Sequence, residues 1–377
     1  MKIVIDGTSV IRSNSGVARY TSELYLELKK ILGRKIITYP IIDNMARHDE
    51  KKKFSRRVLN KFINFSRNIP SSYILRKKYD DFRFKKFTKK KFDIYHEPNF
   101  ILKPFDGKKI VTVHDISWLK FSHYHPRNRV RFMKKYFLKS MSQANFIICV
   151  SNFVKKELIE NFELPEKKIG VTYLAASTKF KLQLDEEIIN NFLNYYKIQK
   201  DNFFLCVGTI EPRKNIENIL DAFSRSKLYN LYGCKLVIAG NKGWQYKKIL
   251  KKIKETIGTL YLENLSDEDL NILFASQKIN LFISKNEGFG LPIVESMKFK
   301  KPVITSNNSS MKEIACEYSV LVDPDNIDNI SSEMRRLYEN NFYYNEYSMK
   351  SERRSNYFSW TSCAEKTLEI YKNVCQK

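Results

Sequence analysis

The sequence predicts an α/β protein with two doubly wound domains in tandem. Short runs rich in β-branched and aromatic residues alternate with helical patterns, as in parallel sheets whose strands are joined by crossover helices. This alternation stops near the middle of the chain and then restarts. The length of 377 residues exceeds what one hydrophobic core usually serves, and a hydrophobic content of 43% is enough for two cores.

In the first half of the chain, β-rich runs predict strands and amphipathic runs predict the helices between them. The strands are expected at 2–5, 36–39, 94–96, 110–113 and 146–150. The helices are expected at 17–28, 127–142 and 153–160.

The second half repeats the pattern. Its strands are expected at 203–207, 235–239, 259–262, 279–284, 303–305 and 320–322. One helix is expected to begin near Asn215, and the acidic run 267–269 is typical of a helix N-terminus.

The domain boundary is expected between about 174 and 201, where polar and charged residues interrupt the strands. This gives a first domain over 1–175 and a second over 176–359. Parallel α/β folds bind ligands at the carboxyl ends of their strands. With two facing domains, the cleft between them is therefore the expected site.

Composition limits where the protein works. No apolar run reaches the roughly 18 to 20 residues of a membrane span, and the opening MKIVIDG predicts a strand without a signal-peptide layout. We therefore expect a cytoplasmic protein or one peripheral to a membrane. The six cysteines are far apart, which indicates reduced thiols and neither a disulfide framework nor a zinc site.

The net charge of +26 is concentrated between Arg47 and Lys91, where Lys and Arg greatly outnumber the four acidic residues. Apolar residues from Phe54 to Ile69 recur at helical spacing with basic residues between them, which is a basic amphipathic pattern. The candidates for docking on an anionic membrane are Arg56, Arg57, Lys61 and Phe62.

Three interpretations of this segment stay open. A basic amphipathic helix can lie on an anionic membrane surface, or it can pack into its own domain with a solvated basic face. The third interpretation, a nucleic-acid patch, lacks a helix-turn-helix, zinc-finger or RNA-recognition signature beside it, so we expect no nucleic-acid partner.

The segment NEGFGLPIVE at 286–295 combines two carboxylates with a glycine turn and a helix start. Gly288 and Gly290 can take backbone angles that other residues resist, and Pro292 suits the first helical position. Backbone N–H groups at such a helix start favour phosphate. Glu287 and Glu295 would then flank a phosphate and accept hydrogen bonds from hydroxyl groups. Simple helix capping and chain reversal are the alternative roles.

A second loop also indicates a phosphate site. In VGTIEPRKN, Gly208 ends a strand and two cations, Arg213 and Lys214, precede a helix. A solvated surface loop could carry the same pair. Taken with the glycine turn, two loops from neighbouring strands would converge on one anionic group.

In the first domain, the strand 110–113 ends in His114 and Asp115, a position that opens onto the expected cleft. Capping of the strand end is the alternative role of this histidine. Gly16 lies in the loop after the first strand, ahead of a helix, and a lone glycine there is a weak phosphate signal. His123 and His125 fit no metal site by spacing, so no metal is expected.

Taken together, these motifs resemble the retaining glycosyltransferases with two facing Rossmann-like domains, known as the GT-B fold, with an E-x7-E motif of the group 1 or family 4 type. The resemblance spans nearly the whole chain and is nearest to bacterial polysaccharide mannosyltransferases. The matching segments are SGVARYT at 15–21, YHEPNF at 95–100, VHD at 113–115, VSNFVKKEL at 150–158, GTIEPRKN at 208–215, LSDEDL at 265–270, EGFGLPIVES at 287–296 and FSWTSCAEKTLEIY at 358–371.

The resemblance implies roles for matching positions in the second domain. Arg213 and Lys214 would bind the donor diphosphate beside Gly208, Glu287 would contact the sugar and Glu295 the ribose. The backbone of the turn would lie beside the sugar; its residues are Gly288, Phe289, Gly290 and Leu291.

In the first domain, the resemblance implies that His114 lies near the reacting carbon and that Gly16 lets the loop approach the diphosphate. The final helix, near 362–375, would cross back to this domain, which adds 360–377 to it. The first domain would bind the acceptor.

The implied activity is transfer of a hexose without a cofactor or a metal, as mannose from GDP-mannose, to a lipid-linked or oligosaccharide acceptor in O-antigen or capsule synthesis. A UDP-hexose donor is the first alternative. A nucleotide-sugar epimerase or phosphorylase, or a non-catalytic basic protein that binds membrane or nucleic acid on the same fold, are the others. The implied location is the inner face of the plasma membrane.

Overall fold

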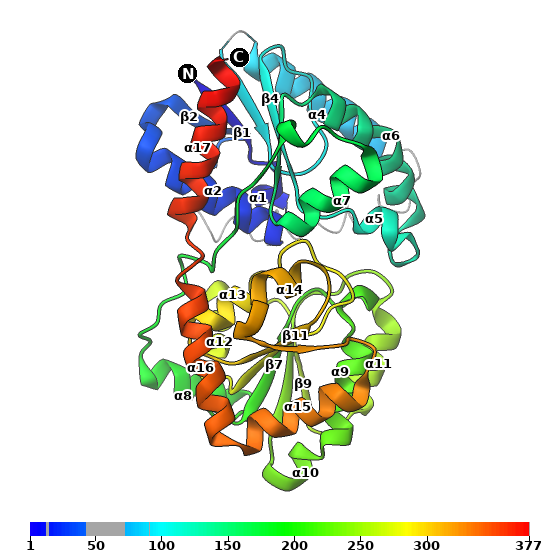
Figure 1. Cartoon of the computed structure of the whole chain (residues 1–377), viewed down its shortest axis with the longest axis vertical. Helices are drawn as coiled ribbons and strands as arrows, with labels where there is room; N and C mark the ends of the chain where they lie inside the picture. The colour runs from blue at the N-terminus through cyan, green and yellow to red at the C-terminus, as the bar shows by residue number, and fades with distance from the viewer. Residues whose placement is uncertain (13–14, 43–71, 90, 377) are drawn as a thin grey trace. The chain divides into compact units, whose positions relative to one another are not determined.

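The computed structural model of the chain describes residues 1–12, 15–42, 72–89 and 91–376. The chain divides into two compact units, which are Met1–Leu174 with Trp360–Lys377, and Ala175–Ser359 (Figure 1). The expected division after residue 175 lies one residue from this one. Among the described helices, none is both long and apolar enough to cross a membrane. The docking candidates Arg56, Arg57, Lys61 and Phe62 lie outside the described residues.

The sheet of unit 1 has six parallel strands in the order β2-β1-β3-β4-β5-β6. The five predicted strands are confirmed, while the sixth was not predicted. Their bounds are β1 Ile3–Asp6, β2 Ile36–Tyr39, β3 Ile94–Glu97, β4 Lys108–Val113, β5 Phe146–Cys149 and β6 Ile169–Val171.

The helices of unit 1 begin where the sequence supplies caps. Ser151 accepts a hydrogen bond from the backbone N–H of Val154, and Ser15 accepts one from that of Ala18. Gly16 is therefore the first residue of its helix, whereas we expected it ahead of the helix. The bounds are α1 Thr8–Arg12, α2 Gly16–Leu32, α4 Ser72–Thr88, α5 Ser117–Lys120, α6 Arg127–Gln143, α7 Asn152–Phe162 and α17 Trp360–Gln376.

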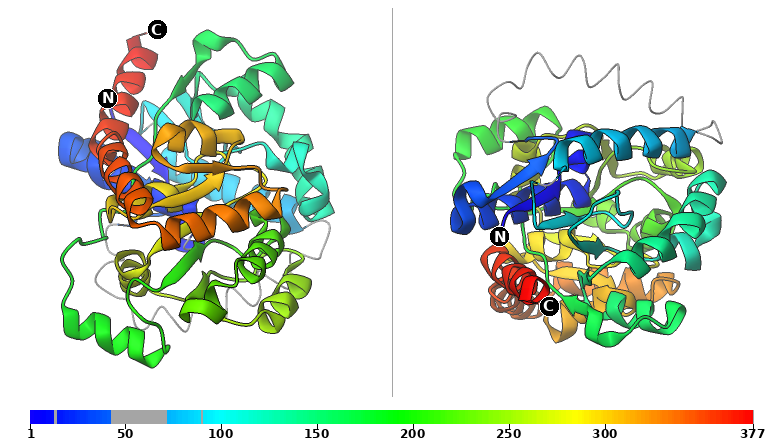
Figure 2. Two further views of the ribbon diagram at one scale, coloured as in Figure 1. Left: turned by 60° about the horizontal axis from the view of Figure 1, so that its bottom comes forward. Right: turned by 90° about the horizontal axis from the view of Figure 1, so that it is seen from above.

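The C-terminal helix α17 belongs to unit 1, where it packs beside α2. The start of β1 and the end of α17 lie on the same side of that unit (Figures 1 and 2). A buried hydrogen bond of 2.6 Å joins Tyr371 Oη to His96 Nδ1, and His96 Nε2 lies 2.7 Å from Thr112 Oγ1. Burial lowers the pKa of His96 to about 3, so the ring is neutral at physiological pH.

Glu97, at the end of β3, is a buried carboxyl group whose titration is expected to affect stability. Burial raises its pKa from the ordinary 4.5 to about 8, although hydrogen bonds from Tyr95 Oη and the Asn99 N–H oppose this. The fold favours the protonated form. Its contribution to stability is therefore complete below about pH 4.5 and is lost as the pH rises towards 8.

Glu97→Gln is expected to unfold like the parent protein at pH 5 and to be more stable than the parent at pH 9. The amide oxygen can still accept from the Asn99 N–H, and the amide NH2 can donate to Tyr95 Oη in place of the hydrogen bond that Tyr95 donates to the carboxyl group. The amide carries no charge at either pH. Denaturant titrations of both proteins between pH 5 and pH 9 measure the difference in their free energies of unfolding. The other titrating groups contribute equally to both proteins and cancel in this difference. A difference that does not change with pH would contradict the assignment.

The sheet of unit 2 also has six parallel strands, in the order β12-β11-β10-β7-β8-β9. All six were predicted, with β10 ending two residues earlier than expected. The bounds are β7 Phe203–Val207, β8 Lys235–Ala239, β9 Thr259–Leu262, β10 Ile279–Phe282, β11 Val303–Ser306 and β12 Val320–Val322.

Helices cover both faces of this sheet. Alternate side chains of β7 point to opposite faces and pack into two different cores. Phe204 and Cys206 pack into the core beneath α9, α11 and α15, and Phe203 and Leu205 pack into the core beneath α8 and α12. The bounds are α8 Glu186–Tyr195, α9 Ile216–Ser226, α10 Leu228–Tyr232, α11 Tyr246–Glu255, α12 Asp267–Ser276, α13 Leu291–Lys298, α14 Ser309–Ala315, α15 Ile327–Glu339 and α16 Asn341–Ser355.

The topology of unit 2 places a ligand-binding position between β7 and β10. The chain runs from β7 outward through β8 and β9, and then returns to β10 on the other side of β7. Loops that leave two neighbouring strands in opposite directions open a crevice at the carboxyl edge of the sheet, where α/β proteins bind ligands.

The cysteines are free thiols, as expected. Cys149, Cys206, Cys234 and Cys363 are buried, whereas Cys375 is exposed on the last turn of α17. Among the described residues, no group of three His, Cys, Asp or Glu side chains could hold a metal ion.

Candidate functional site

The two loops predicted to bind phosphate meet between β7 and β10. The first runs from Gly208 to Asn215, and the second connects β10 to α13. The backbone N–H of Lys285 donates to the carbonyl oxygen of Arg213 at 2.8 Å, which fixes one loop against the other. The sequence prediction that these loops converge is therefore confirmed.

Arg213 lies at the centre of this contact, with a side chain only 11% exposed. Its guanidinium group donates from Nε and Nη2 to Glu211 Oε1, at 3.1 and 2.7 Å. Its Nη1 donates to the carbonyl oxygen of Asn286 at 2.6 Å and lies 2.9 Å from Glu287 Oε2. The planar group is thus held on two sides, in the geometry that suits arginine better than lysine.

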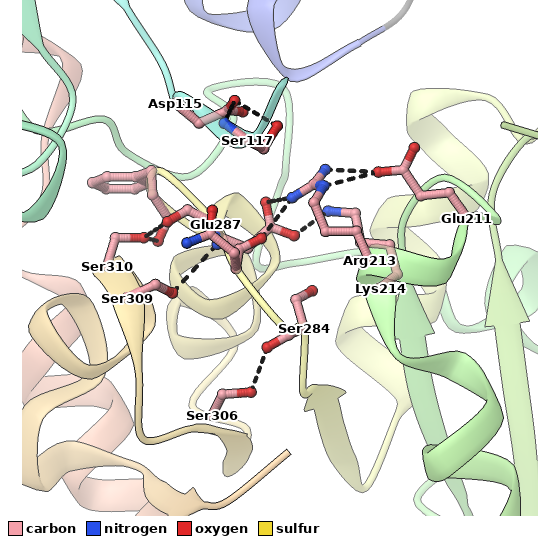
Figure 3. A network of polar contacts seen from close by, with 12 residues as sticks. Asp115, Ser117, Glu211, Arg213, Lys214, Ser284, Glu287, Ser306, Ser309 and Ser310 are labelled. Atoms are coloured by element: carbon pink, nitrogen blue, oxygen red, sulfur yellow. Dashed lines mark hydrogen bonds and ion pairs between the residues drawn. The ribbon is translucent and has the colours of Figure 1, made fainter. Parts of the chain in front are cut away.

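Lys214 contacts the other oxygen of the Glu287 carboxylate (Figure 3). Its Nζ lies 2.5 Å from Glu287 Oε1 and 5.0 Å from the centre of the Phe282 ring. Two cations and two carboxylates therefore share one largely buried cluster, which comprises Glu211, Arg213, Lys214 and Glu287. We refer to it as the charge cluster.

Glu287 is ionised in this cluster. Burial by itself would raise the pKa of its carboxyl group, but the combined attraction of Arg213 and Lys214 outweighs burial and leaves the pKa below its ordinary value. The formal charges of the four side chains cancel. An arriving phosphate would have to compete with carboxylates for the two cations.

Serines of the next strand and helix hold the second loop in place. Ser310 Oγ lies 2.8 Å from the carbonyl oxygen of Glu287 and 3.1 Å from that of Phe289, and Ser309 Oγ accepts from the Glu287 N–H at 3.3 Å. Below them, Ser306 Oγ donates to the carbonyl oxygen of Ser284 at 2.7 Å. These contacts fix the backbone of Glu287 independently of its side chain (Figure 3).

Two glycines allow the close approaches in this region. Gly290 has φ +103°, and a Cβ there would lie 2.9 Å from the Ile293 side chain. Gly240, at the end of β8, has no room for a side chain, because a Cβ would lie 1.9 Å from the Gly208 carbonyl oxygen. Sequence reasoning had identified Gly208 and Gly290 but not Gly240.

The start of α13 differs slightly from the prediction. Leu291 is its first residue and Pro292 its second, whereas we expected proline first. Glu295 lies one turn into the helix, as predicted, and is only 2% exposed. Phe289 is also buried, and packs edge-on against Phe358 at 5.8 Å between ring centres.

His114 follows β4 in unit 1, as predicted. Its Nε2 donates to the Pro98 carbonyl oxygen at 2.8 Å, and the rings of Tyr20 and Phe100 pack edge-on against it at 5.1 and 6.0 Å. Burial lowers its pKa, despite opposing effects of the Pro98 carbonyl and Asp115. The ring is therefore neutral, with the proton on Nε2 and an acceptor at Nδ1.

Asp115 accepts from the backbone N–H and hydroxyl of Ser117 at 2.9 and 2.7 Å, at the start of α5. His125 Nε2 lies 3.0 Å from the same hydroxyl. Asp115 therefore holds the backbone after β4. His114 and Gly16 belong to unit 1, and the charge cluster belongs to unit 2.

Comparison with known proteins identifies the family. A model described as "Glycosyl transferases group 1" matches residues 189–355, and one described as "Glycosyltransferase Family 4" matches residues 14–179. The chain is 32% identical to O-antigen chain mannosyltransferase B of Escherichia coli over 284 residues, which cover 74% of each chain. The chain belongs to the group 1, family 4 type of glycosyltransferases.

Other relatives of this glycosyltransferase are more distant. Serotype-specific mannosyltransferase WbdA of Escherichia coli is 26% identical over 280 residues, which span only 34% of that longer protein. The structure of Anabaena HepE in complex with UDP and glucose has a TM-score of 0.70 and covers 99% of this chain at 15% identity. That likeness establishes the fold, which is GT-B.

The charge cluster of the glycosyltransferase combines two chemical capacities. Arg213 and Lys214 can neutralise a diphosphate, and Glu287 can accept hydrogen bonds from hydroxyl groups. Sequence reasoning missed Glu211, Ser309 and Ser310, because no motif marks a carboxylate two residues before an arginine or serines that support a loop.

Proposed function

We propose that this glycosyltransferase transfers mannose from GDP-mannose, with retention of anomeric configuration, to a lipid-linked or oligosaccharide acceptor in O-antigen or capsule synthesis. The names of its relatives support the sugar, since O-antigen chain mannosyltransferase B and WbdA are both mannosyltransferases. The observation that carries the proposal is the charge cluster at the carboxyl edge of the unit 2 sheet.

In the proposed reaction, Arg213 and Lys214 bind the donor diphosphate and stabilise the charge that forms as the sugar leaves. Glu287 exchanges its cation partners for hydroxyls of the donor sugar, and Glu295 holds the ribose. The leaving phosphate oxygen accepts the proton of the acceptor hydroxyl on the face from which it departs, so that no enzymatic nucleophile is needed.

The remaining site residues have further roles in this reaction. The backbone from Gly288 to Leu291 lies beside the sugar, Gly16 lets its loop approach the diphosphate, and the neutral His114 contacts the sugar near the reacting carbon. No metal or cofactor takes part in this scheme, and unit 1 binds the acceptor. We place the enzyme on the inner face of the plasma membrane, where a lipid-linked acceptor is accessible.

Thermal unfolding in the presence of nucleotide sugars tests the donor. At one hundred times its dissociation constant, a ligand of the folded state adds about 2.7 kcal/mol of stability. We expect GDP-mannose and GDP to raise the melting temperature, and UDP-glucose to leave it unchanged at equal concentration. The opposite order would replace GDP-mannose by a UDP-hexose, the donor class named in structures of HepE.

Two measurements on the product complete the test. Incubation with the donor alone should leave its sugar unaltered, whereas an epimerase would convert it. The anomeric configuration of the transferred sugar, read by proton NMR, should match that of the donor.

A further inference from the structure

Helix α4 (Ser72–Thr88) has apolar side chains on two opposite faces. Successive residues of an α-helix lie about 100° apart around its axis, so Leu75, Tyr79 and Phe82 fall within roughly 60° of one another. By the same count, Phe84 and Thr88 lie on the opposite side. One of these faces packs into unit 1, and the other does not.

The inner face is a normal packing surface. Phe84 is fully buried and contacts the rings of Tyr39 and Tyr95, at 5.4 and 4.5 Å between centres. Thr88 is buried beside it. This side of α4 anchors the helix to unit 1, with α6 as its neighbour (Figure 1).

The outer face presents a stripe of large apolar side chains to solvent. Leu75 is 64% exposed, Tyr79 59% and Phe82 70%. Their i, i+4, i+7 spacing makes them contiguous on the helix. We refer to these three residues as the α4 stripe. None of the three side chains is part of the core, so polar residues would serve equally well at these positions. Three adjacent exposed apolar side chains therefore indicate an interaction surface.

Basic side chains border the α4 stripe on both sides. Lys78 and Lys85 lie along one edge, Arg83 lies along the other, and Lys86 continues the line of the stripe; all four are exposed. The Arg83 guanidinium lies over the Tyr79 ring, 5.7 Å from its centre. The acidic residues of the helix, Asp80 and Asp81, are half-buried on the side away from the stripe.

We infer that the α4 stripe inserts into the interface of an anionic lipid bilayer, with the surrounding lysines and arginine on the lipid headgroups. An apolar and aromatic centre between cations suits a helix lying in the plane of a membrane, and long basic side chains can keep their charge in the headgroup layer. The inference rests on the proposed membrane association and assigns it to a described surface.

Charge complementarity favours an anionic bilayer over a second copy of the chain as the partner of the α4 stripe. Two copies of the chain would bring the same basic faces together and repel each other. An anionic bilayer offers both an apolar layer for the stripe and a negative surface, which strengthens binding by about fivefold for each basic residue near it.

Vesicle flotation with the full chain tests the inference. We expect the protein to float with vesicles of phosphatidylcholine and phosphatidylglycerol in a 7:3 ratio, and to float weakly with phosphatidylcholine alone. The triple variant Leu75→Ser, Tyr79→Ser, Phe82→Ser should lower the partition coefficient about tenfold or more. Replacing Lys78, Lys85 and Lys86 by glutamine should weaken binding to the anionic vesicles only.

A matched control removes three apolar residues of unit 2 that are also more than half exposed. Ile188, Tyr195 and Phe342 are 58%, 79% and 82% exposed, and their replacement by serine should leave flotation unchanged. Insertion is read directly from Phe82→Trp, whose added indole fluorescence should shift to the blue and be quenched by brominated lipids. The stabilisation of each variant by GDP-mannose reports donor binding, so failure of the proposed donor and failure of docking give different results.

Two results would overturn the inference. If the α4 triple variant floats like the parent while charge reversal at Arg56, Arg57 and Lys61 abolishes flotation, the membrane is bound by the segment before α4. If the parent does not float with anionic vesicles at all, the α4 stripe serves another partner.

Discussion

Lys214→Ala is expected to lower the turnover number of sugar transfer about a hundredfold or more, the usual effect of losing one preorganised group that stabilises a leaving charge. The Lys214 ammonium group lies 2.5 Å from Glu287 and supplies one of the two positive charges of the charge cluster. We expect the variant to bind the donor more weakly and to have a slower chemical step. Steady-state kinetics with GDP-mannose, alongside calorimetric titration with GDP, separates the two effects.

Lys301→Ala is the matched control for this variant. Lys301 has the same side-chain exposure of 14% and the same 2.5 Å distance to a carboxylate, that of Asp201. Its removal costs a similar ion pair elsewhere in unit 2, so its turnover should stay within a few-fold of the parent. Equal losses in both variants would mean that the effect of Lys214 is on folding and not on transfer.

Glu287→Gln is expected to bind GDP more tightly than the parent enzyme and yet to transfer sugar about a hundredfold more slowly. The carboxylate forms ion pairs with both Arg213 and Lys214, so a diphosphate that binds these cations has to replace it. Loss of two competing ion pairs, worth about 1 kcal/mol each, should improve the dissociation constant of GDP about tenfold or more. The amide keeps the shape of the side chain but binds sugar hydroxyls more weakly than a carboxylate does.

Glu211→Gln separates competition for the Arg213 guanidinium group from contact with the sugar. Glu211 bonds the same guanidinium group at 2.7 Å from the side of Arg213 that does not face Glu287, and its role in the proposal includes no sugar contact. Its replacement should also tighten GDP binding while transfer is retained. If Glu287→Gln instead weakens GDP and slows transfer in proportion, the carboxylate acts by holding the cations in place.

The strands could be predicted because most are buried on both faces and therefore appear as short continuous apolar runs. Phe203–Val207 and Val303–Ser306 are examples. The missed strand, Ile169–Val171, is only three residues long and includes a glycine. Helix starts were predictable where the cap is in the local sequence, as at Ser266, whose capping box with Asp269 starts α12.

The site was predictable only in part. Motif spacing identified the residues of the two loops, because glycine, proline and paired cations leave a local signal. The pairing of Lys214 with Glu287 joins residues 73 positions apart, and such a contact depends on the strand order, which no local pattern contains. The sequence therefore predicted a sugar-binding role for Glu287 but not its ion pairs with Arg213 and Lys214.

The return of α17 to unit 1 has a consequence for synthesis of the chain. Unit 2 is one continuous stretch, Ala175–Ser359, whereas unit 1 is completed by residues that follow it. During translation the ribosome releases all of unit 2 before Tyr371 can bond His96, its partner 275 positions earlier. Unit 2 can thus finish folding before unit 1. The surface of unit 1 beside α2 stays uncovered until α17 emerges and packs against it.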